Sequence, residues 1–448
     1  MTKLFGTDGV RGKAGEFPLD VPTIRRLGAA LVRALRHNGE HSGEIKFLAG
    51  RDTRESGAWI EQELAFGIQS QGGTFTSTGV VPTPAIAYLT PRLDYSAGVV
   101  ISASHNPFED NGIKVFSGAG EKFTETLERQ VEAIIADSSW SVPGDAAGPV
   151  DELDLRSEYL DHLRDILPEG DRARGMRIAI DCANGATATV APRLFREMGF
   201  DVTCIGVTPD GRNINLGCGS TAPETLVKLV LDDHRALGVA FDGDGDRAIF
   251  VDRSGRVVDG DAVMLMCAKQ MKAENRLKGS AIVATVMSNI GLELALRGAD
   301  IGMVRCSVGD KYVMEEMLRR DLSLGGEQSG HIIFSDYLFT GDGLATALNV
   351  LRTMSASRRE LGDLASELKT YPQVLMNLRV REKTDLKAIP EIADTIASVE
   401  ARLTGNGRLL VRYSGTEPLL RVMLEGQDQG EIRQWGQEII DVVKRHLA

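Results

Sequence analysis

The sequence predicts an α/β protein built from several domains, and three observations support this prediction. A chain of 448 residues is too long for one hydrophobic core, so about three or four domains of ordinary size are expected. Apolar segments that end in Asp and continue into small or polar turn residues recur along the chain. Segments with helical spacing lie between them, which is typical of parallel or mixed sheets covered by helices.

The recurring apolar segments are the predicted strands, because each of them runs into a turn. Three of them end in Asp, and a fourth is a looser copy that ends in Ser-Asn. Glycine contributes 49 residues and aromatic residues only 5%, which suits many tight connections between strands and loops. The four segments are KFLAGRDTR (46–54), RIAIDCANGAT (177–187), GVAFDGDGDR (238–247) and IVATVMSN (282–289).

Amphipathic helices are predicted where apolar residues recur three or four positions apart. We assign these apolar residues to the hydrophobic core. The clearest sets are Val21, Ile24, Leu27, Leu31 and Leu35; Ile60, Leu64 and Ile68; and Tyr159, Leu160, Leu163 and Leu167.

Composition indicates where the domains meet. The stretch 137–149 is rich in Gly, Pro and Ser, the region 355–363 is polar, and TYPQ (370–373) opens a final segment. The amphipathic end EIRQWGQEIIDVVKRHL is typical of a helix in a small α+β domain. The predicted domains are residues 1–150, 151–252, 253–369 and 370–448.

Charge and composition exclude several classes of protein. A net charge of -12 would repel nucleic acid and anionic membranes, and no run of Lys and Arg supplies a basic patch. Five widely spaced cysteines without a Cys-x-x-Cys pair indicate neither a disulfide framework nor a zinc site. No stretch approaches the roughly 18 apolar residues of a membrane helix, and the N-terminus has no apolar signal segment. We therefore expect a soluble, cytoplasmic protein.

The segment ISASHNP (101–107) follows the apolar run AGVV (97–100) with no charged residue between them. A buried strand that ends in small polar residues and a proline places side chains at the edge of a sheet. This edge is where α/β proteins bind their ligands. Ser104 in this loop is therefore a candidate for chemistry.

The segment FDGDGDR predicts a metal site, because Asp242, Asp244 and Asp246 alternate with glycines directly after a strand. Alternation in an extended loop points the carboxylates the same way, and glycines let the backbone curve around a cation. Three hard oxygen ligands suit Mg²⁺ or Ca²⁺. An EF-hand is not predicted, because Arg247 stands where that loop needs glycine and Arg253 where it needs glutamate. A solvated acidic turn is the remaining alternative.

A phosphorylated side chain can supply a further metal ligand, since Mg²⁺ commonly shares its shell with phosphate oxygens. Ser104 is the candidate, because a serine phosphate carries negative charge and three acceptor oxygens. Cations would then be needed nearby, and Arg11, Lys114 and Arg247 lie in comparable glycine-punctuated loops. His331, in the small-residue loop GGEQSGHIIF, is a candidate acid or base.

The segment RYSGTEP (412–418) resembles an anion cradle. Ser, Gly and Thr in a tight turn offer successive backbone N–H groups and two hydroxyls, and flanking arginines add positive charge. A plain turn is the alternative, but a cradle is favoured because the other motifs also handle phosphate. The residues of this predicted site are Arg412, Ser414, Gly415, Thr416 and Arg421.

Together these motifs resemble those of the alpha-D-phosphohexomutase superfamily. Four of them match in the expected order: the phosphoserine loop ISASHNP, the metal loop DGDGDR, the sugar loop GEQSGH and the phosphate loop RYSGTEP. No motif position departs from the pattern. FGTDGVRG near the N-terminus and Gln328 in the sugar loop look like the glucosamine branch of the superfamily.

The resemblance implies four domains around a central cleft: three related α/β modules with mixed sheets and a smaller C-terminal α+β domain. It also implies an isomerase that interconverts glucosamine 6-phosphate and glucosamine 1-phosphate, feeding UDP-N-acetylglucosamine and peptidoglycan synthesis. A small sugar phosphate is the expected partner, nucleic acid and membranes are not, and a homodimer is left open.

The reaction that the resemblance implies proceeds through a phosphoserine enzyme. Phosphorylated Ser104 donates its phosphoryl group to O1 of the sugar, which gives glucosamine 1,6-bisphosphate as intermediate and activator. The intermediate then turns around, and Ser104 takes back the other phosphate. One Mg²⁺ per chain is bound by Ser104, Asp242, Asp244 and Asp246.

Further roles are also implied by the resemblance. Lys114 and Arg11 neutralise the transferring phosphate, and Arg247 supports the metal loop or the ligand. Lys114 or His331 assists proton movement at the sugar hydroxyl, and the sequence does not choose between them. The ligand-binding residues are Glu327 and Ser329 for the sugar hydroxyls and Arg412, Ser414, Gly415, Thr416 and Arg421 for the phosphate that is not reacting.

Three alternatives remain open from the sequence. A phosphomannomutase or phosphoglucomutase belongs to the same superfamily but acts on another sugar. A magnesium-dependent sugar phosphatase could use Asp242 as nucleophile, because a strand followed by Asp-x-Asp suits that chemistry too. A sugar-phosphate sensor would bind its ligand without turnover.

Overall fold

The fold consists of two compact units. The computed structural model describes residues 3–6, 8–37, 43–142, 148–414 and 418–448. One unit comprises Met1–Met287 and Ala299–Glu367, and the other comprises Ser288–Gly298 and Leu368–Ala448. The helix within Ser288–Gly298 therefore belongs to the C-terminal unit, although the predicted third domain surrounds it in the sequence.

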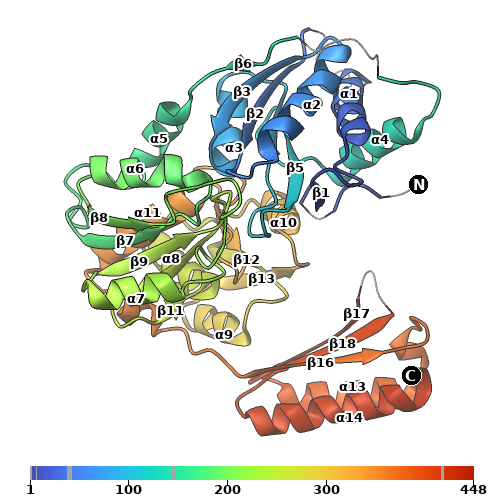
Figure 1. Cartoon of the computed structure of the whole chain (residues 1–448). Coiled ribbons are helices and arrows are strands. Elements are labelled where there is room, and N and C mark those ends of the chain that lie inside the picture. Colours follow the sequence, from blue (N-terminus) through green and yellow to red (C-terminus); the bar gives the residue numbers. More distant parts are fainter. Residues whose placement is uncertain (1–2, 7, 38–42, 143–147, 415–417) are drawn as a thin grey trace. The chain divides into compact units, whose positions relative to one another are not determined.

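The first sheet has six strands in the order β1-β5-β4-β2-β3-β6 and positions the Ser104 loop. Strands β2, β3, β4 and β6 run parallel, and β5 pairs antiparallel with β4 and β1. Helices α1, α2 and α4 pack together on one face and α3 lies on the other (Figure 1). The elements are β1 (Val10–Lys13), α1 (Val21–His37), β2 (Lys46–Arg51), α2 (Gly57–Ser70), β3 (Thr74–Val80), α3 (Thr83–Arg92), β4 (Ala97–Ile101), β5 (Asp110–Ser117), α4 (Glu125–Ala136) and β6 (Asp151–Glu152).

The second sheet has five strands in the order β11-β10-β9-β7-β8 and positions the metal loop. Strands β9 and β10 form an antiparallel hairpin in which Phe241 pairs with Ala248, so the loop between them is DGDGDR. The elements are α5 (Arg156–Arg164), β7 (Arg177–Asp181), η1 (Ala186–Thr189), α6 (Ala191–Glu197), β8 (Asp201–Ile205), α7 (Glu224–Asp232), β9 (Leu237–Phe241), β10 (Ala248–Asp252) and β11 (Val257–Val258).

The third sheet has four strands in the order β13-β12-β14-β15 and positions the predicted sugar loop. Strands β14 and β15 form an antiparallel hairpin whose connection carries Glu327, Ser329 and His331. The elements are α8 (Gly260–Ala273), η2 (Lys278–Ser280), β12 (Ala281–Thr285), α9 (Ile290–Gly298), β13 (Gly302–Cys306), α10 (Asp310–Arg320), β14 (Leu324–Gly326), β15 (Ile332–Phe334), α11 (Gly343–Ser357) and α12 (Leu361–Ala365).

The C-terminal sheet has three antiparallel strands in the order β16-β18-β17. Two long helices, α13 and α14, lie side by side and cover one face of it (Figure 1). Alternate residues of the strands, for example Val374 and Val422, form one core with helix residues such as Val443. The elements are β16 (Gln373–Arg379), η3 (Leu386–Ala388), α13 (Pro390–Leu403), β17 (Arg408–Tyr413), β18 (Leu419–Glu425) and α14 (Gln429–Leu447).

Helix α9 joins the C-terminal unit through a buried carboxylate on the other face of that sheet. The side chain of Glu425 is fully buried and accepts a hydrogen bond from the backbone N–H of Ile290 at 3.0 Å. Arg408 forms an ion pair with the same carboxylate at 2.9 Å. The Asn289 side chain accepts from the N–H of Tyr371 at 2.9 Å, which fastens the start of α9 to the chain that enters β16.

The predicted fold class is confirmed: three modules have mixed sheets with helical cover, and the C-terminal module is smaller. Each predicted strand segment contains a strand, and the first two helical patterns lie in α1 and α2. The third is only partly confirmed, because α5 contains Tyr159, Leu160 and Leu163 but ends at Arg164, before Leu167. Strand β6 lies just beyond the predicted domain boundary at residue 150 but pairs with β3. Strand β11 lies just beyond the predicted boundary at residue 252 but pairs with β10. Both strands therefore complete the sheet that precedes the boundary.

Candidate active site

Ser104 lies in the loop that leaves β4, at the edge of the first sheet. Its side chain is fully buried, and its hydroxyl donates a hydrogen bond to Oδ2 of Asp242 at 2.5 Å. The backbone of Ser104 has φ +53°, a left-handed conformation that is uncommon for a residue other than glycine. Strained conformations of this kind cluster at functional sites, where the surrounding structure holds them. The loop therefore presents Ser104 directly to the metal loop.

The metal loop gathers its three aspartates into one buried cluster. The side chains of Asp242, Asp244 and Asp246 each offer an oxygen, and these oxygens lie within 4.8 Å of one another. Oδ1 of Asp244 and Oδ1 of Asp246 are buried and have no hydrogen-bond partner among the described residues. Buried polar atoms almost always have partners, so these two oxygens fit a cation ligand set. Carboxylate oxygens are the donors that Mg²⁺ and Ca²⁺ prefer.

Lys114 on β5 is the cation closest to these aspartates. Its ammonium group lies 2.7 Å from Oδ2 of Asp244 and 3.1 Å from Oδ2 of Asp246. A third carboxylate, that of Asp8, lies 3.0 Å away. Burial alone would lower the pKa of Lys114, but the surrounding carboxylates raise it well above its ordinary value. The ammonium group therefore donates hydrogen bonds to Asp244 and Asp246 and forms an ion pair with Asp8.

Asp8 connects Lys114 to a chain of charges that the sequence analysis missed. It forms ion pairs with Arg11 and Lys122 as well, and Lys122 reaches on to Asp310 at the start of α10. Burial alone would raise the pKa of Asp8, but Lys114 and Lys122 hold it well below its ordinary value. Asp8 lies inside the quoted motif FGTDGVRG, whereas Lys122 and Asp310 lie in no recognised motif.

Arg247 closes the metal loop and reaches the Ser104 loop. Its backbone N–H donates to Oδ1 of Asp242 at 3.1 Å, and its guanidinium lies 3.1 Å from Nδ1 of His105. Burial, with Arg247 and Arg11 nearby, lowers the pKa of His105 to about 4. His105 is therefore neutral at pH 7, and its Nδ1 accepts a hydrogen bond from Arg247.

His331 lies at the end of the hairpin loop in the third sheet, beside the metal loop. Its backbone forms a bridge with that of Arg247, so the two hairpins meet at this point. Its buried ring receives a hydrogen bond on Nε2 from the N–H of Gly341 at 3.2 Å. Oδ2 of Asp310 lies 3.4 Å from the same nitrogen. The ring thus has a partner for Nε2 in either protonation state, while Nδ1 has none among the described residues.

A cavity of about 400 Å³ opens above these groups, which is a size typical of small-molecule sites. Its wall carries both positive and negative side chains, among them Arg11, Arg247, Asp8 and Asp310. Glu327 is held there because its carboxylate accepts a hydrogen bond from the N–H of Gly309 at 3.1 Å. Ser329 is exposed and lies 3.4 Å from the same carboxylate. The lining residues are Leu4, Gly6, Asp8, Gly9, Arg11, His105, Arg247, Val308, Gly309, Asp310 and Glu327.

In the C-terminal unit, Arg412 and Arg421 lie opposite each other on the paired strands β17 and β18. Nε of Arg421 is buried and has no hydrogen-bond partner among the described residues. Ser414 is buried, and its N–H donates to the carbonyl of Leu419 at 2.7 Å. The predicted ligand residues Gly415 and Thr416 lie outside the described residues.

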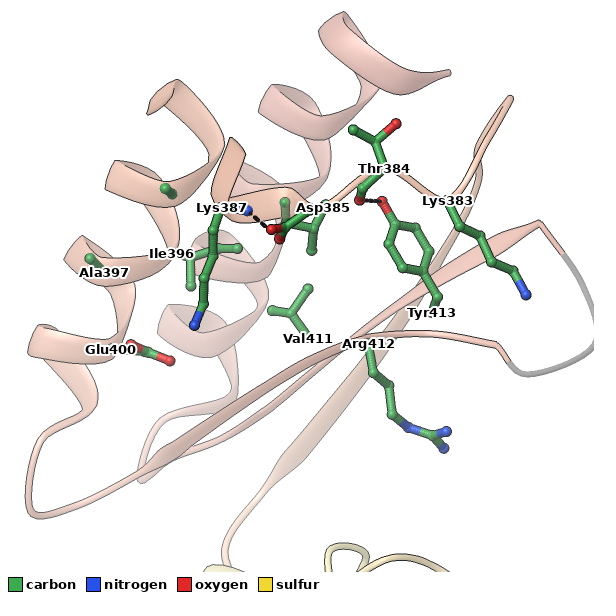
Figure 2. A pocket seen from close by; sticks show the side chains of 12 residues that line it. Lys383, Thr384, Asp385, Lys387, Ile396, Ala397, Glu400, Val411, Arg412 and Tyr413 are labelled. Carbon is green, nitrogen blue, oxygen red and sulfur yellow. Dashed lines mark hydrogen bonds between the residues drawn. The ribbon is translucent and has the colours of Figure 1, made fainter. Parts of the chain in front are cut away.

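A cavity of about 920 Å³ lies behind β17, between this strand and the segment that contains η3 and α13. Val411 and Tyr413 point into it, whereas the side chain of Arg412 points away (Figure 2). The hydroxyl of Tyr413 donates to the carbonyl of Thr384 at 2.7 Å. The strand therefore separates this cavity from the face that carries the arginines.

The chain matches, in order, models of all four domains of one protein family. The phosphoglucomutase/phosphomannomutase alpha/beta/alpha domains I, II and III match residues 2–141, 157–255 and 259–371, and the C-terminal domain matches residues 375–442. The chain belongs to this family. The expected resemblance to the phosphohexomutases and the expectation of an enzyme, an isomerase that transfers a phosphoryl group, are confirmed.

Relatives and solved structures cover nearly the whole chain. A phosphoglucosamine mutase from Syntrophotalea carbinolica is 46% identical over 450 residues, which cover 100% of this chain and 98% of that protein. One from Solibacter usitatus is 47% identical and covers 99% of both. A phosphoglucomutase/phosphomannomutase family protein from Burkholderia thailandensis has a TM-score of 0.82 at 22% identity, covering 99% of this chain and 97% of that one.

A more distant solved structure is Aspergillus fumigatus N-acetylphosphoglucosamine mutase in complex with GlcNAc-6P and magnesium. It has a TM-score of 0.63 at 16% identity and covers 99% of this chain and 95% of that one. At such identities the likeness concerns the fold. Within the described part of the chain, none of the helices has the length and apolarity that a bilayer span needs.

Proposed function

We propose that the chain is a phosphoglucosamine mutase, which interconverts glucosamine 6-phosphate and glucosamine 1-phosphate and so supplies UDP-N-acetylglucosamine for cell-wall synthesis. The observation that carries the proposal is the buried Ser104 hydroxyl, 2.5 Å from a carboxylate of the aspartate cluster. Whole-length identity of 46–47% to proteins of that name supports the choice of sugar.

One Mg²⁺ would be held by Asp242, Asp244, Asp246 and a phosphate oxygen on Ser104. The two buried carboxylate oxygens without partners support this assignment. When bound, such a cation neutralises the charge of the phosphoryl group that is being transferred. Thr83 fixes the orientation of the loop, because its hydroxyl donates to Oδ2 of Asp244 at 2.5 Å.

Phosphoryl transfer then breaks the bond between phosphorus and Oγ of Ser104 and forms a bond to O1 of glucosamine 6-phosphate. The O1 proton passes to a base of the protein, and the product is glucosamine 1,6-bisphosphate. After the intermediate has turned around, Oγ of Ser104 forms a bond to its 6-phosphoryl group and the bond between phosphorus and O6 breaks. O6 takes up the proton that the base received from O1, and glucosamine 1-phosphate is released. Because such transfer needs mainly positioning and charge neutralisation, the roles of Lys114 and Arg11 are to stabilise the transferring oxygens.

His331 is a better candidate for the base than Lys114. Lys114 is surrounded by three carboxylates that raise its pKa well above its ordinary value, so its nitrogen stays protonated and has no lone pair to offer the sugar. In the tautomer that carries its proton on Nε2, 3.4 Å from Oδ2 of Asp310, the His331 ring has a lone pair on Nδ1 that can accept the proton of the sugar. Its Nδ1 is buried without a partner, which is compatible with a bound hydroxyl group as the missing one.

The remaining residues would bind the substrate. Glu327 and Ser329 would receive sugar hydroxyls, because they lie at and beside the wall of the cavity above the metal loop. Arg247 would support the metal loop, to which its backbone is hydrogen-bonded. The phosphate that is not reacting would be bound in the C-terminal unit by Arg412, Ser414, Gly415, Thr416 and Arg421.

The proposal keeps the domains at residues 1–150, 151–252, 253–369 and 370–448. It also keeps a cytoplasmic location, with a sugar phosphate as partner and neither nucleic acid nor a membrane. A homodimer would be recognised by light scattering of the purified protein.

One experiment tests the function. Turnover is measured with Mg²⁺ on glucosamine, N-acetylglucosamine, glucose and mannose 6-phosphates, and intact mass reports phosphate on the protein. We expect glucosamine 6-phosphate to be the best substrate and Ser104 to carry phosphate that Ser104→Ala lacks. Phosphate on an aspartate would instead support a phosphatase, a higher rate on mannose or glucose would support another mutase, and binding without turnover would support a sensor.

A further inference from the structure

The side chain of Arg54 is hydrogen-bonded to the backbone of the Ser104 loop. Arg54 follows β2, its side chain is fully buried, and its Nε donates to Oδ2 of Asp52 at 2.9 Å. Its terminal nitrogens donate to four backbone carbonyls of the segment 104–110. These are the carbonyls of Ser104 and Asn106, both at 2.9 Å, of Asp110 at 3.0 Å, and of Pro107.

Asn215, which lies in the module of the second sheet, is hydrogen-bonded to the same loop. Its side-chain amide donates to the carbonyl of Ser104 at 3.0 Å and to that of Asn106 at 3.2 Å. These are the two carbonyls that Nη2 of Arg54 also contacts. A carbonyl oxygen has two lone pairs, so each one can accept from both sides at once.

The metal loop touches the same point. A methyl group placed on Gly243 would lie 2.5 Å from the carbonyl oxygen of Ser104 and 3.0 Å from Nδ2 of Asn215. Only a glycine therefore lets the metal loop lie against this carbonyl. The peptide after Ser104 is thus held by Arg54, Asn215 and the backbone of the metal loop.

We propose that Arg54 and Asn215 are positioning residues that clamp the Ser104 loop and thereby set the position of the Ser104 hydroxyl relative to Asp242. Neither side chain touches the hydroxyl. They hold the carbonyl of a residue whose φ of +53° is unfavourable for serine, so the clamp keeps the hydroxyl aimed at the aspartates. This inference rests on the proposed function, because it assigns the clamp to phosphoryl transfer by Ser104.

A clamp that serves catalysis differs from one that only stabilises the fold. Misplacing a reacting group by about 1 Å can cost on the order of 10²-fold in rate without weakening ligand binding. A purely structural contact would lower the melting temperature and leave kcat of the folded protein unchanged. The ratio of effects on kcat and KM therefore separates the two.

Asn215→Gly is the principal variant, because glycine removes the amide and still accepts the φ of +58° found there. Asn275→Gly is its matched control, since Asn275 has φ +57° in an exposed turn remote from the loop in sequence. Asn215→Asp keeps the shape but turns a donor into an acceptor that faces two carbonyls. Arg54→Lys keeps the charge but loses the planar fork.

The measurements are kcat and KM with glucosamine 6-phosphate, the fraction of Ser104 phosphorylated after incubation with glucose 1,6-bisphosphate, and hydrogen exchange of residues 102–110. For Asn215→Gly we expect kcat to fall about 10- to 100-fold, KM to stay within about twofold and exchange to accelerate. The fall in kcat should be larger for Asn215→Asp than for Asn215→Gly. Asn275→Gly should have the kcat, KM and exchange of the wild type. Arg54→Lys should load Ser104 more slowly.

Wild-type kcat in Asn215→Gly, or equal losses in the glycine and aspartate variants, would overturn the proposal. If Arg54→Lys fails to fold, the Asn215 variants still test the proposed clamp. If the wild-type protein turns over no sugar phosphate, the proposed function fails. Unchanged exchange of residues 102–110 in Asn215→Gly would then overturn the clamp independently.

Discussion

The charges around Ser104 are compensated within the protein, whereas those on the open face of the C-terminal sheet are not. Lys114 contacts three carboxylates, and Asp8 contacts three cations. Arg412 and Arg421, by contrast, lie opposite each other, and neither forms an ion pair within the described residues. The first region is preorganised before a ligand arrives, and the second leaves positive charge for an anion to neutralise.

The open face of the C-terminal sheet carries both a compensated and an uncompensated charge. At one end Glu425 is buried under α9 and paired with Arg408. At the other end Arg421 lies between Asn377 and Arg412, the residues opposite it on the neighbouring strands. Like charges directly opposite each other cost roughly 0.2–1 kcal/mol, so the pair weakens the sheet unless an anion binds there.

The largest effect is expected from Lys114→Met. Three buried carboxylates would lose their shared cation, which costs about 3–5 kcal/mol when a buried pair is broken. We also expect kcat to fall on the order of 10³-fold, because the proposed mechanism assigns this charge to the transferring phosphate. Urea unfolding and steady-state kinetics measure the two effects.

The control for this variant is Lys278→Met, which breaks the exposed ion pair with Asp321. Its cost should stay below about 1 kcal/mol. If both lysine variants cost the same, the charges around Ser104 are not interdependent.

The buried carboxyl group of Asp342 has no cation among its hydrogen-bond partners in the described part of the chain, unlike the carboxylates around Ser104. Asp342 accepts from the Tyr159 hydroxyl at 2.9 Å and from the N–H of Ala345, and burial raises its pKa to about 6. Because this pKa lies above that of the unfolded chain, stability from Asp342 is complete below about pH 4 and is lost as the pH rises through 6. Asp342→Asn should therefore gain on the order of 2–3 kcal/mol at pH 8 and nothing at pH 4. Equal gains at both pH values in urea unfolding would contradict the raised pKa.

Removing an uncompensated arginine should affect ligand binding alone. We expect Arg412→Ala and Arg421→Ala to raise KM about 10- to 100-fold, since a charged hydrogen bond to phosphate contributes about 1.5–3 kcal/mol. The melting temperature should stay the same or rise, because a repulsive pair is relieved. Arg402→Ala, in an exposed pair with Glu438 on the helical side, is the control and should leave KM unchanged.

The smallest effect is expected from Arg379→Ala. Arg379 is exposed on β16, opposite Leu419 and two residue pairs further along the strands than Arg421. At this distance it adds to the field at the phosphate without direct contact, so KM should rise about two- to fivefold at low salt. The effect should vanish in 0.5 M salt. Persistence at high salt would show that Arg379 binds the ligand directly.

Local patterns predicted the part of the site that lies in single loops. The strand before ISASHNP and the alternation of Asp and Gly in DGDGDR placed Ser104 and the aspartates at sheet edges, where the structure brings them together. The strand-then-loop repeat also predicted several related α/β modules, and the number three came from the family resemblance.

Long-range pairs were missed because they leave no local pattern. Lys122 and Asp310 are 188 residues apart, and neither spacing nor composition connects them. Arg54 follows a strand in the same way as the residues of the metal loop, but its buried acceptors are backbone carbonyls, which every residue possesses. Helix α9 was assigned to the third domain because of its position in the sequence, whereas the structure connects it to the C-terminal unit through the hydrogen bond from Ile290 to Glu425.

The contact between Ile290 and Glu425 also constrains how the chain folds as it leaves the ribosome. These residues are 135 positions apart, so at about 5–20 residues per second α9 emerges about 7–27 seconds before its partner strand is made. During that interval the apolar side of a nascent helix is uncovered. The C-terminal unit therefore acquires this contact only after β18 has been translated.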